Sequence, residues 1–153
     1  MSVAFRRESD EEHLEPKFEL PVPPGPNPVT ARGYDLLRSR TEQLEAAVVA
    51  EPDEERRKIL QRDLRYWRAR LATAQIAPLA AGGSVAFGTR VTFRDKGRER
   101  TLTIVGHDEA DPADHTIAFS APLARRLMGA EAGDEIEAAD GSDPIDIVAV
   151  EPA

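Results

Sequence analysis

Two apolar seams with coiled-coil spacing, mirrored about a single turn, constrain the fold of this chain more than any other feature. The members of the first seam are 3-4-3-4 apart: Tyr34, Leu37, Thr41, Leu44 and Val48. The members of the second are 4-3-4-3 apart: Leu60, Leu64, Trp67, Leu71 and Ala74. When the second seam is read in reverse, each pair of positions sums to 108. Two antiparallel helices joined by one turn must give such a constant sum, so the sequence predicts a short antiparallel coiled coil.

The turn of this coiled coil falls in the acidic stretch 50–55. Pro52 is tolerated in a first helical turn, and carboxylates complement the positive end of a helix. We therefore expect the acidic residues at the tip to cap the second helix: Glu51, Asp53, Glu54 and Glu55. Thr30 is the expected N-cap of the first helix. An arm from Ala31 to Ala50 would be about 30 Å long at a rise of about 1.5 Å per residue.

The second helix carries a basic outer surface: Arg56, Arg57, Lys58, Arg62, Arg65, Arg68 and Arg70. Two interpretations stay open. The surface is either a solvated face with intrahelical ion pairs or an electrostatic guide toward an acidic partner. The net charge of the whole chain is −8, which argues against broad non-specific binding to nucleic acid.

The N-terminal segment, residues 1–28, holds six of the twelve prolines and an acidic cluster. Its apolar residues follow no single helical or strand period, and such a composition is typical of disorder. We expect a disordered, proline-rich acidic tail over residues 1–28. The alternative is a short docking segment around residues 18–24.

After Pro78 and the Gly82-Gly83 joint, the apolar pattern changes to period two. Five short strands are predicted, together with one helix that a proline opens and Gly129 closes. The strands are expected at 85–93, 100–105, 116–119, 135–138 and 145–150, and the helix at 121–129. The turn between the first two strands is expected at 95–97. The fold class is therefore α+β.

Other chemistry is not supported by the sequence. With no cysteine there is no disulfide framework and no cysteine-ligated metal. No apolar run approaches a membrane span and the start is too acidic for a signal peptide, so we expect a cytoplasmic protein. A polar run could suggest a metal loop: His107, Asp108, Glu109, Asp111, Asp114 and His115. Its spacing matches no metal motif, and a solvated connection between strands is expected instead.

Four stretches of the sequence resemble the bacterial Gre transcript-cleavage factors. The stretch from Val105 reads Val-Gly-His-Asp-Glu-Ala-Asp, and the stretch from Ile117 reads Ile-Ala-Phe-Ser-Ala-Pro-Leu-Ala-Arg-Arg-Leu-Met-Gly. Ala132-Gly-Asp-Glu-Ile follows. At the start of the coiled coil, Thr30-Ala-Arg-Gly-Tyr-Asp-Leu-Leu is similar to the opening of the Gre arm. The resemblance covers residues 29–153 in the family's domain order.

The resemblance implies an FKBP-like C-terminal domain beside a coiled-coil arm. It also implies binding at the secondary channel of RNA polymerase, where the C-terminal domain docks on the rim and the arm enters the channel. In the family, two acidic residues at the arm tip help to hold a catalytic Mg²⁺ for RNA cleavage. The family's docking segment maps here onto Ser120, Pro122, Leu123, Ala124, Arg125 and Leu127.

The arm departs from the Gre pattern. Gre arms are close to twice as long and carry a Gly-Asp-Leu-x-Glu-Asn-Ala acidic segment that is absent between Thr30 and Pro78. The shortened arm is also similar to that of the nucleoside diphosphate kinase regulator (Rnk) family. We expect a tail over 1–28, a coiled coil over 29–78 and a Gre-like domain over 79–153.

The leading hypothesis is a monomeric regulator that binds RNA polymerase, is not itself an enzyme and needs no metal or cofactor. It would meet nucleic acid only through the polymerase, and no membrane. Two alternatives remain: a true Gre-type factor that stimulates RNA cleavage through its acidic turn, and an Rnk-like or other protein-interaction module.

Overall fold

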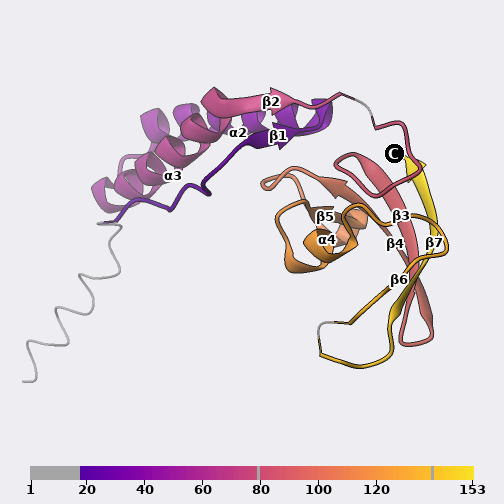
Figure 1. Cartoon of the computed structure of the whole chain (residues 1–153). Helices are drawn as coiled ribbons and strands as arrows, with labels where there is room; N and C mark the ends of the chain where they lie inside the picture. The colour runs from indigo at the N-terminus through magenta and orange to yellow at the C-terminus, as the bar shows by residue number, and fades with distance from the viewer. Residues whose placement is uncertain (1–17, 79, 139) are drawn as a thin grey trace, which may run out of the picture. The chain divides into compact units, whose positions relative to one another are not determined.

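The computed structural model describes residues 18–78, 80–138 and 140–153. The chain forms two compact units (Figure 1). The first contains residues 18–26 and Asp35–Ala74, and the second contains Asn27–Tyr34 and the described residues from Gln75 to Ala153. Among the described residues, no helix has an apolar stretch long enough to cross a membrane.

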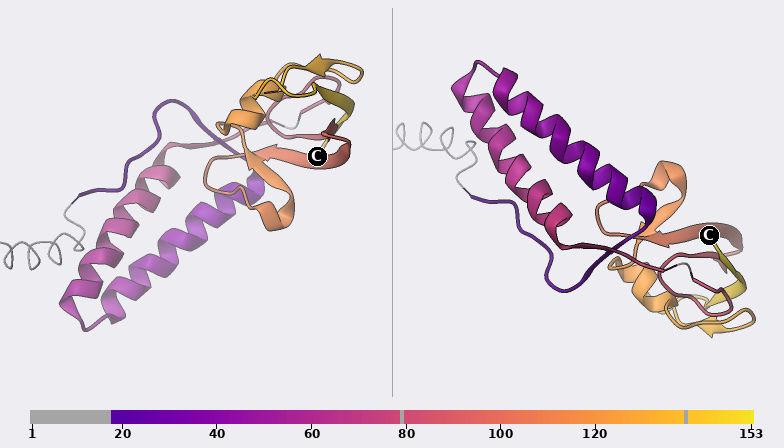
Figure 2. Two further views of the ribbon diagram at one scale, coloured as in Figure 1. Left: turned by 90° about the horizontal axis from the view of Figure 1, so that it is seen from below. Right: turned by 90° about the horizontal axis from the view of Figure 1, so that it is seen from above.

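The first unit is a helical hairpin, as the two seams predict. Helix α2 spans Ala31–Ala50 and helix α3 spans Glu54–Thr73, and the two views of Figure 2 show them antiparallel and side by side. The middle of the seam is the best buried part, with Leu37, Thr41, Leu44 and Leu64 at 6% exposure or less. The Thr41 hydroxyl donates to the carbonyl oxygen of Leu37 at 2.8 Å, so this polar seam residue is satisfied within its own helix.

The ends of the hairpin differ from the sequence prediction in two places. Ala74, the last member of the second seam, leaves the helix: it is the C-cap of α3 and begins strand β2, Ala74–Ile76. Arg70, which was assigned to the basic outer surface, is buried at 2% exposure. Its position on α3 turns it inward, so it is no part of a solvated face.

The predicted tail ends earlier than expected. Asn27–Val29 forms strand β1, which pairs with β2 in a two-stranded sheet, and both Asn27 and Val29 are buried. A strand at the edge of a sheet tolerates a proline, which explains how Pro28 fits there. Residues 18–26 are described without a helix or strand. The expectation of disorder over residues 1–17 falls outside the described residues.

The second unit contains a five-stranded sheet in the order β5-β4-β3-β7-β6. Strands β3 (Thr89–Asp95) and β4 (Arg98–Val105) form an antiparallel hairpin, and β7 (Ile145–Pro152) pairs antiparallel on the other side of β3. Strand β6 (Glu135–Ile136) pairs antiparallel with β7, whereas β5 (Thr116–Ala118) runs parallel to β4 after the short helix η1 (Pro112–Asp114). The predicted α+β class is confirmed.

Local chemistry explains where the first hairpin begins and turns. Lys96 and Gly97 have φ values of 55° and 79°, the left-handed pair that a two-residue turn between twisted strands requires. The predicted strand at 85–93 begins later, at Thr89. Gly88 has a positive φ of 86°, and the Thr89 hydroxyl donates to the carbonyl oxygen of Ala86, so residues 86–89 form a turn instead.

The core lies between one face of this sheet and helix α4, Pro122–Leu127. Alternate residues of β3, Val91 and Phe93, are fully buried, and Ile104 of β4 and Ile147 of β7 join them. Ala124 and Leu127 cover this layer from α4. The helix is thereby fixed to the sheet by its own apolar side, which leaves its other side for the surface.

Candidate docking surface and arm tip

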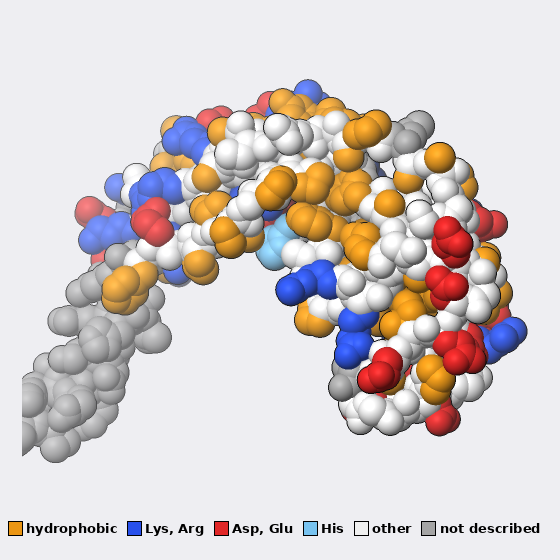
Figure 3. Space-filling view, viewed as in Figure 1, with side chains coloured by type: hydrophobic (Ala, Val, Ile, Leu, Met, Phe, Trp, Pro, Cys, Tyr) orange, Lys and Arg blue, Asp and Glu red, His pale blue; other side chains and the backbone are white. Residues whose placement is uncertain are grey.

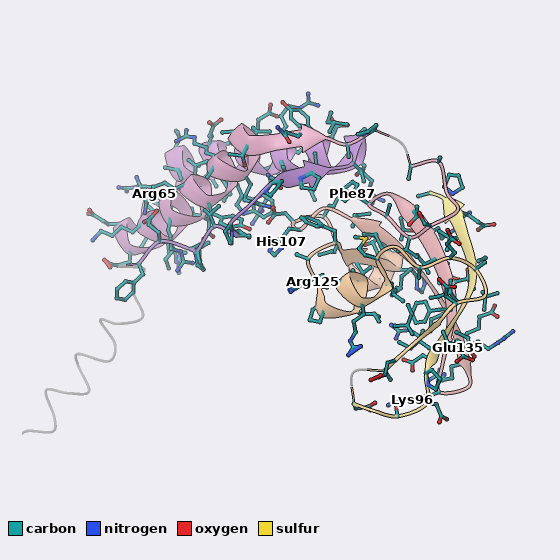
Figure 4. The ribbon with its side chains drawn as sticks, in the orientation of Figure 1. Arg65, Phe87, Lys96, His107, Arg125 and Glu135 are labelled. Carbon is teal, nitrogen blue, oxygen red and sulfur yellow. The ribbon has the colours of Figure 1, made fainter. Side chains whose placement is uncertain are left out.

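Helix α4 has a well-defined start and end, and it exposes one of its sides. Pro122 occupies its first turn, where the missing N–H costs nothing, and Gly129 follows its end with a φ of 83°. Ala121 stands at the N-cap position without a side-chain hydrogen bond. Pro122 and Arg125 are exposed, and Figure 4 labels Arg125 on the helix.

The predicted docking residues separate into two groups. Ser120 and Leu123 are half-buried, Pro122 and Arg125 are exposed, and these four can meet a partner. Ala124 and Leu127 were expected to belong to the same surface, but both are 0% exposed in the core. They lie one helical turn apart on the side that packs on the sheet, so their role is to hold the helix in place.

A hollow of about 330 Å³ lies beside Pro122 and Leu123. Its apolar lining includes Ala138 and Ile145, and its polar lining is Asp95, Lys96, Arg126, Asp140 and Ser142. The Lys96 Nζ and Asp140 Oδ2 atoms are 3.5 Å apart, and Arg126 Nη1 donates to the carbonyl oxygen of Glu137 at 2.8 Å. The hollow cannot be predicted from sequence spacing, because its residues come from the β3–β4 turn, from α4 and from the segment that joins β6 to β7.

The hollow has one carboxylate whose charge is strongly stabilised. Hydrogen bonds from the Ser142 side chain and backbone, and then the charge of Lys96, lower the pKa of Asp140 from 3.8 to about 2. The Ser142 amide nitrogen lies 2.9 Å from Asp140 Oδ1. Asp140 is therefore ionised throughout the neutral range, and the hollow presents a fixed pattern of charges beside apolar surface.

Next to this surface, His107 contacts Ser120. The His107 Nδ1 and Ser120 Oγ atoms are 3.0 Å apart, which joins the loop after β4 to the segment before α4; Figure 4 labels His107. Neither residue type nor spacing in the sequence indicated this pair. It fixes Ser120 in place at one end of the candidate docking surface.

At the arm tip, carboxylates hold the turn. Asp53 is the N-cap of α3, and its Oδ2 accepts the backbone N–H of Arg56 at 2.9 Å. Glu51 Oε2 accepts the backbone N–H of Asp53 at 3.1 Å. Glu54 and Glu55 lie in the first turn of α3, where their charges complement the helix dipole. The Arg57 guanidinium also stabilises the turn, since it donates to the carbonyl oxygens of Glu51 and Pro52, both at 3.2 Å.

The basic face of α3 is extensively paired, and Figure 3 shows acidic and basic side chains interspersed on the arm. Arg68 pairs with Glu45 at 2.9 Å, Arg62 with Asp63 at 3.2 Å and Lys58 with Glu55 at 3.8 Å. These pairs favour the solvated-face interpretation of the arginine-rich surface.

One partner comes from the N-terminal segment. Arg65 donates to both carboxylate oxygens of Glu19, at 2.6 and 2.7 Å. This hydrogen bond lowers the pKa of Glu19 and raises the pKa of Arg65. Phe18 precedes Glu19 and is 83% exposed, and the docking alternative for residues 18–24 stays a prediction.

Comparison with known proteins gives consistent matches. The model of the family described as "Transcription elongation factor, GreA/GreB, C-term" matches residues 80–152. Transcription elongation factor GreA of Thioalkalivibrio sulfidiphilus is 32% identical over 151 residues, covering 80% of this chain and 96% of the relative. GreB of Neisseria meningitidis serogroup B is 38% identical over 118 residues, covering 75% of this chain and 58% of the relative. GreA of Desulfovibrio desulfuricans is 35% identical over 108 residues, and this chain spans 57% of its length.

Solved structures of the same kind are found at lower similarity. The GreA factor homolog 1 (Gfh1) of Thermus thermophilus is 17% identical with a TM-score of 0.38, covering 83% of this chain and 99% of that one. The GreA/GreB factor of Nitrosomonas europaea is 24% identical with a TM-score of 0.39, covering 84% and 99%.

Proposed function

Because this chain belongs to the GreA/GreB family of transcription elongation factors, we propose that it binds RNA polymerase at the secondary channel and modulates elongation without strongly stimulating transcript cleavage. The C-terminal domain would dock on the channel rim, and the arm would occupy the channel. We further propose that the protein acts as a monomer and has no catalytic centre of its own.

Docking is supported by the surface around α4. Pro122 and Leu123 occupy the positions that the family uses for the rim, and in this chain they border a hollow of about 330 Å³. A protein interface commonly depends on a few apolar anchors surrounded by polar contacts. Apolar Pro122 and Leu123 beside the charges of Lys96, Asp140 and Arg126 provide this combination.

The proposal that cleavage is not strongly stimulated depends on one observation: the acidic side chains at the tip are engaged in capping the turn and helix α3. Asp53 and Glu51 each accept a backbone N–H within the turn, which is the work of capping residues. A carboxylate that completes the coordination of Mg²⁺ must place an oxygen about 2.0–2.1 Å from the ion. Helices of 20 residues reach only about 30 Å, at about 1.5 Å per residue.

The similarity to full-length relatives is consistent with a shortened arm. The alignment with the Thioalkalivibrio factor has 151 positions, but it includes only 80% of this chain. The remaining positions are gaps in this chain, where the relative has residues without a counterpart here. The acidic segment typical of Gre arms is also missing from residues 30–78.

A competition experiment tests the proposal. Bacterial RNA polymerase is immobilised, loaded with a labelled GreA-type cleavage factor and titrated with this protein. Displacement of the labelled factor, at concentrations near the Kd of this protein for polymerase, is expected. Simultaneous binding of both proteins would place this protein elsewhere on the enzyme, and absence of any binding would support an interaction module for another partner.

A further inference from the structure

Glu109 lies in the polar run that the sequence raised as a candidate metal loop, yet its carboxylate is used differently. No group of three or more metal-ligating side chains is found among the described residues. Instead the Glu109 carboxylate accepts three hydrogen bonds: from the Thr30 backbone N–H at 2.9 Å, from the Thr30 hydroxyl at 2.5 Å and from the Gly106 backbone N–H at 3.0 Å.

Thr30 is the N-cap of α2. Its hydroxyl oxygen accepts the backbone N–H of Gly33 at 2.9 Å, and its carbonyl oxygen accepts the backbone N–H of Tyr34 at 2.9 Å. A hydroxyl can accept from one group and donate to another, so the same oxygen also serves Glu109. In a capping box, a Glu or Gln at position N3 returns to bind the N–H of the N-cap residue. Position N3 of α2 is Gly33, which has no side chain to do this.

The space that an N3 side chain would occupy is filled by Glu109. A Cβ placed on Gly33 would lie 2.3 Å from Glu109 Oε2, far inside contact distance. Gly106 is crowded in the same way, since its Cβ would lie 2.7 Å from that oxygen and 2.9 Å from the carbonyl oxygen of Pro28. Gly33 lies in the first turn of α2, and glycine is a poor residue for a helix because it loses more conformational freedom on folding than alanine does. Close approach of the carboxylate explains both glycines.

The Glu109 carboxylate also supplies a negative charge at the N-terminus of α2. The first turn of α2 contains no acidic residue of its own. An anionic group at a helix N-terminus is stabilising because the backbone N–H groups there carry partial positive charge. Glu109 supplies this negative charge from a position 79 residues further along the chain than Thr30.

We propose that Glu109 is a positioning residue for the arm: it completes, from the C-terminal domain, the capping box that α2 lacks in its own sequence, and it thereby sets where the arm begins. Residues 27–34 belong to the same compact unit as Glu109, and α2 continues beyond them into the helical hairpin. This inference does not rest on the proposed function, because it concerns the start of the arm and not what the arm binds.

The test removes the carboxylate of Glu109 and introduces one at position N3 of α2, its usual place in a capping box. Hydrogen exchange of the amides of residues 31–34 is measured in the full chain for wild type, Glu109→Ala, Gly33→Glu and the double variant. Glu109→Ala is expected to speed exchange by about 2- to 30-fold, the size of a lost cap. Gly33→Glu alone is expected to be destabilising because two carboxylates compete for one space. In the Glu109→Ala background, Gly33→Glu is expected to slow exchange again, because the new side chain forms an ordinary capping box.

Two further variants make the outcome decisive. Glu109→Gln keeps an acceptor and is expected to exchange closer to wild type than Glu109→Ala does, since glutamine also serves at N3. Glu131→Ala, at an exposed glutamate of the same domain, is the matched control and should leave these amides unchanged. Equal damage from Gly33→Glu in both backgrounds would overturn the proposal, as would unchanged exchange in Glu109→Ala.

Discussion

The Asp53 carboxylate accepts a hydrogen bond from the backbone N–H of Arg56, with 2.9 Å between Asp53 Oδ2 and the amide nitrogen. This contact makes Asp53 a helix cap. Glu51 accepts the backbone N–H of Asp53, so two carboxylates at the arm tip are engaged in hydrogen bonds within the turn. The acidic tip of this Gre-family arm therefore has the chemistry of a helix terminus.

The middle of the arm depends on one buried leucine of α3. Leu64 is 6% exposed and is predicted to lie opposite Leu44, which is also buried, so Leu64→Asp would place a charge in apolar packing. Loss of a buried leucine alone costs about 2–5 kcal/mol, and the unpaired carboxylate adds to that cost. We expect loss of helical circular dichroism and a lower melting temperature. Val49→Asp, at a position 86% exposed in the last turn of α2, is the control and should lower the melting temperature far less, because it costs only an unfavourable interaction with the helix dipole. An unaltered melt for Leu64→Asp would show that the helices are paired wrongly.

Docking should depend on the exposed start of α4. Aspartate is well suited to a first helical turn, so the domain should remain folded in Pro122→Asp. The substitution replaces an exposed apolar side chain with a charge beside Leu123. An apolar anchor is commonly worth more than about 1 kcal/mol, so Kd for RNA polymerase should rise at least about fivefold. Ala113→Asp adds the same charge at an exposed site on η1 and should bind normally. Wild-type affinity of Pro122→Asp would move the docking surface elsewhere.

The N-cap position of α4 lacks a side-chain hydrogen bond that could stabilise the helix. Ala121 offers no side-chain acceptor to the first turn, and serine at an N-cap is worth about 0.5–2 kcal/mol relative to alanine. Ala121→Ser should therefore increase the free energy of unfolding of the C-terminal domain in a urea titration. Ala113→Ser, outside the helix, serves as the matched comparison. If Ala121→Ser were neutral or destabilising, the start of α4 would differ from the one described.

Asp140 should titrate unusually low. Its pKa is about 2 in the folded protein, against an ordinary value of 3.8, because Ser142 and Lys96 stabilise the carboxylate. A lowered folded pKa contributes stability that is fully present above about pH 4 and is lost as pH falls toward 2. Carboxyl chemical shifts followed by NMR should show this pKa, and Ser142→Ala should raise it toward 3.8. Titration of wild-type Asp140 at its ordinary value would contradict the hydrogen bonds assigned to it.

The arm was predictable because its information is local and periodic. Leu37, Leu44 and Leu64 repeat at coiled-coil spacing, and the antiparallel pairing follows from their order alone. The turn at Lys96-Gly97 was equally local. Ala74 and Pro28 were misplaced because their strand pairing joins the two ends of the hairpin, and neither end shows a strand period by itself.

The candidate site was only half predictable. Pattern matching placed α4 correctly but could not separate Pro122, which is exposed, from Leu127, which is buried, because that distinction depends on which side of the helix meets the sheet. The Lys96–Asp140 pair and the Glu109–Thr30 contact join residues distant in sequence. Only the fold brings such residues together, and no spacing rule would have found them.

RNA cleavage in a backtracked elongation complex distinguishes occupation of the channel from stimulation of cleavage. This protein is expected to release little or no 3′ RNA fragment by itself, and an excess of it is expected to inhibit cleavage by a GreA-type factor. Substituting Asp53, Glu54 and Glu55 with lysine should leave basal cleavage unchanged and cost only helix-terminus stability, about 0.3–1 kcal/mol per charge. Strong cleavage with the wild-type protein that disappears in this triple variant would contradict the account, because the acidic turn would then act on the catalytic Mg²⁺.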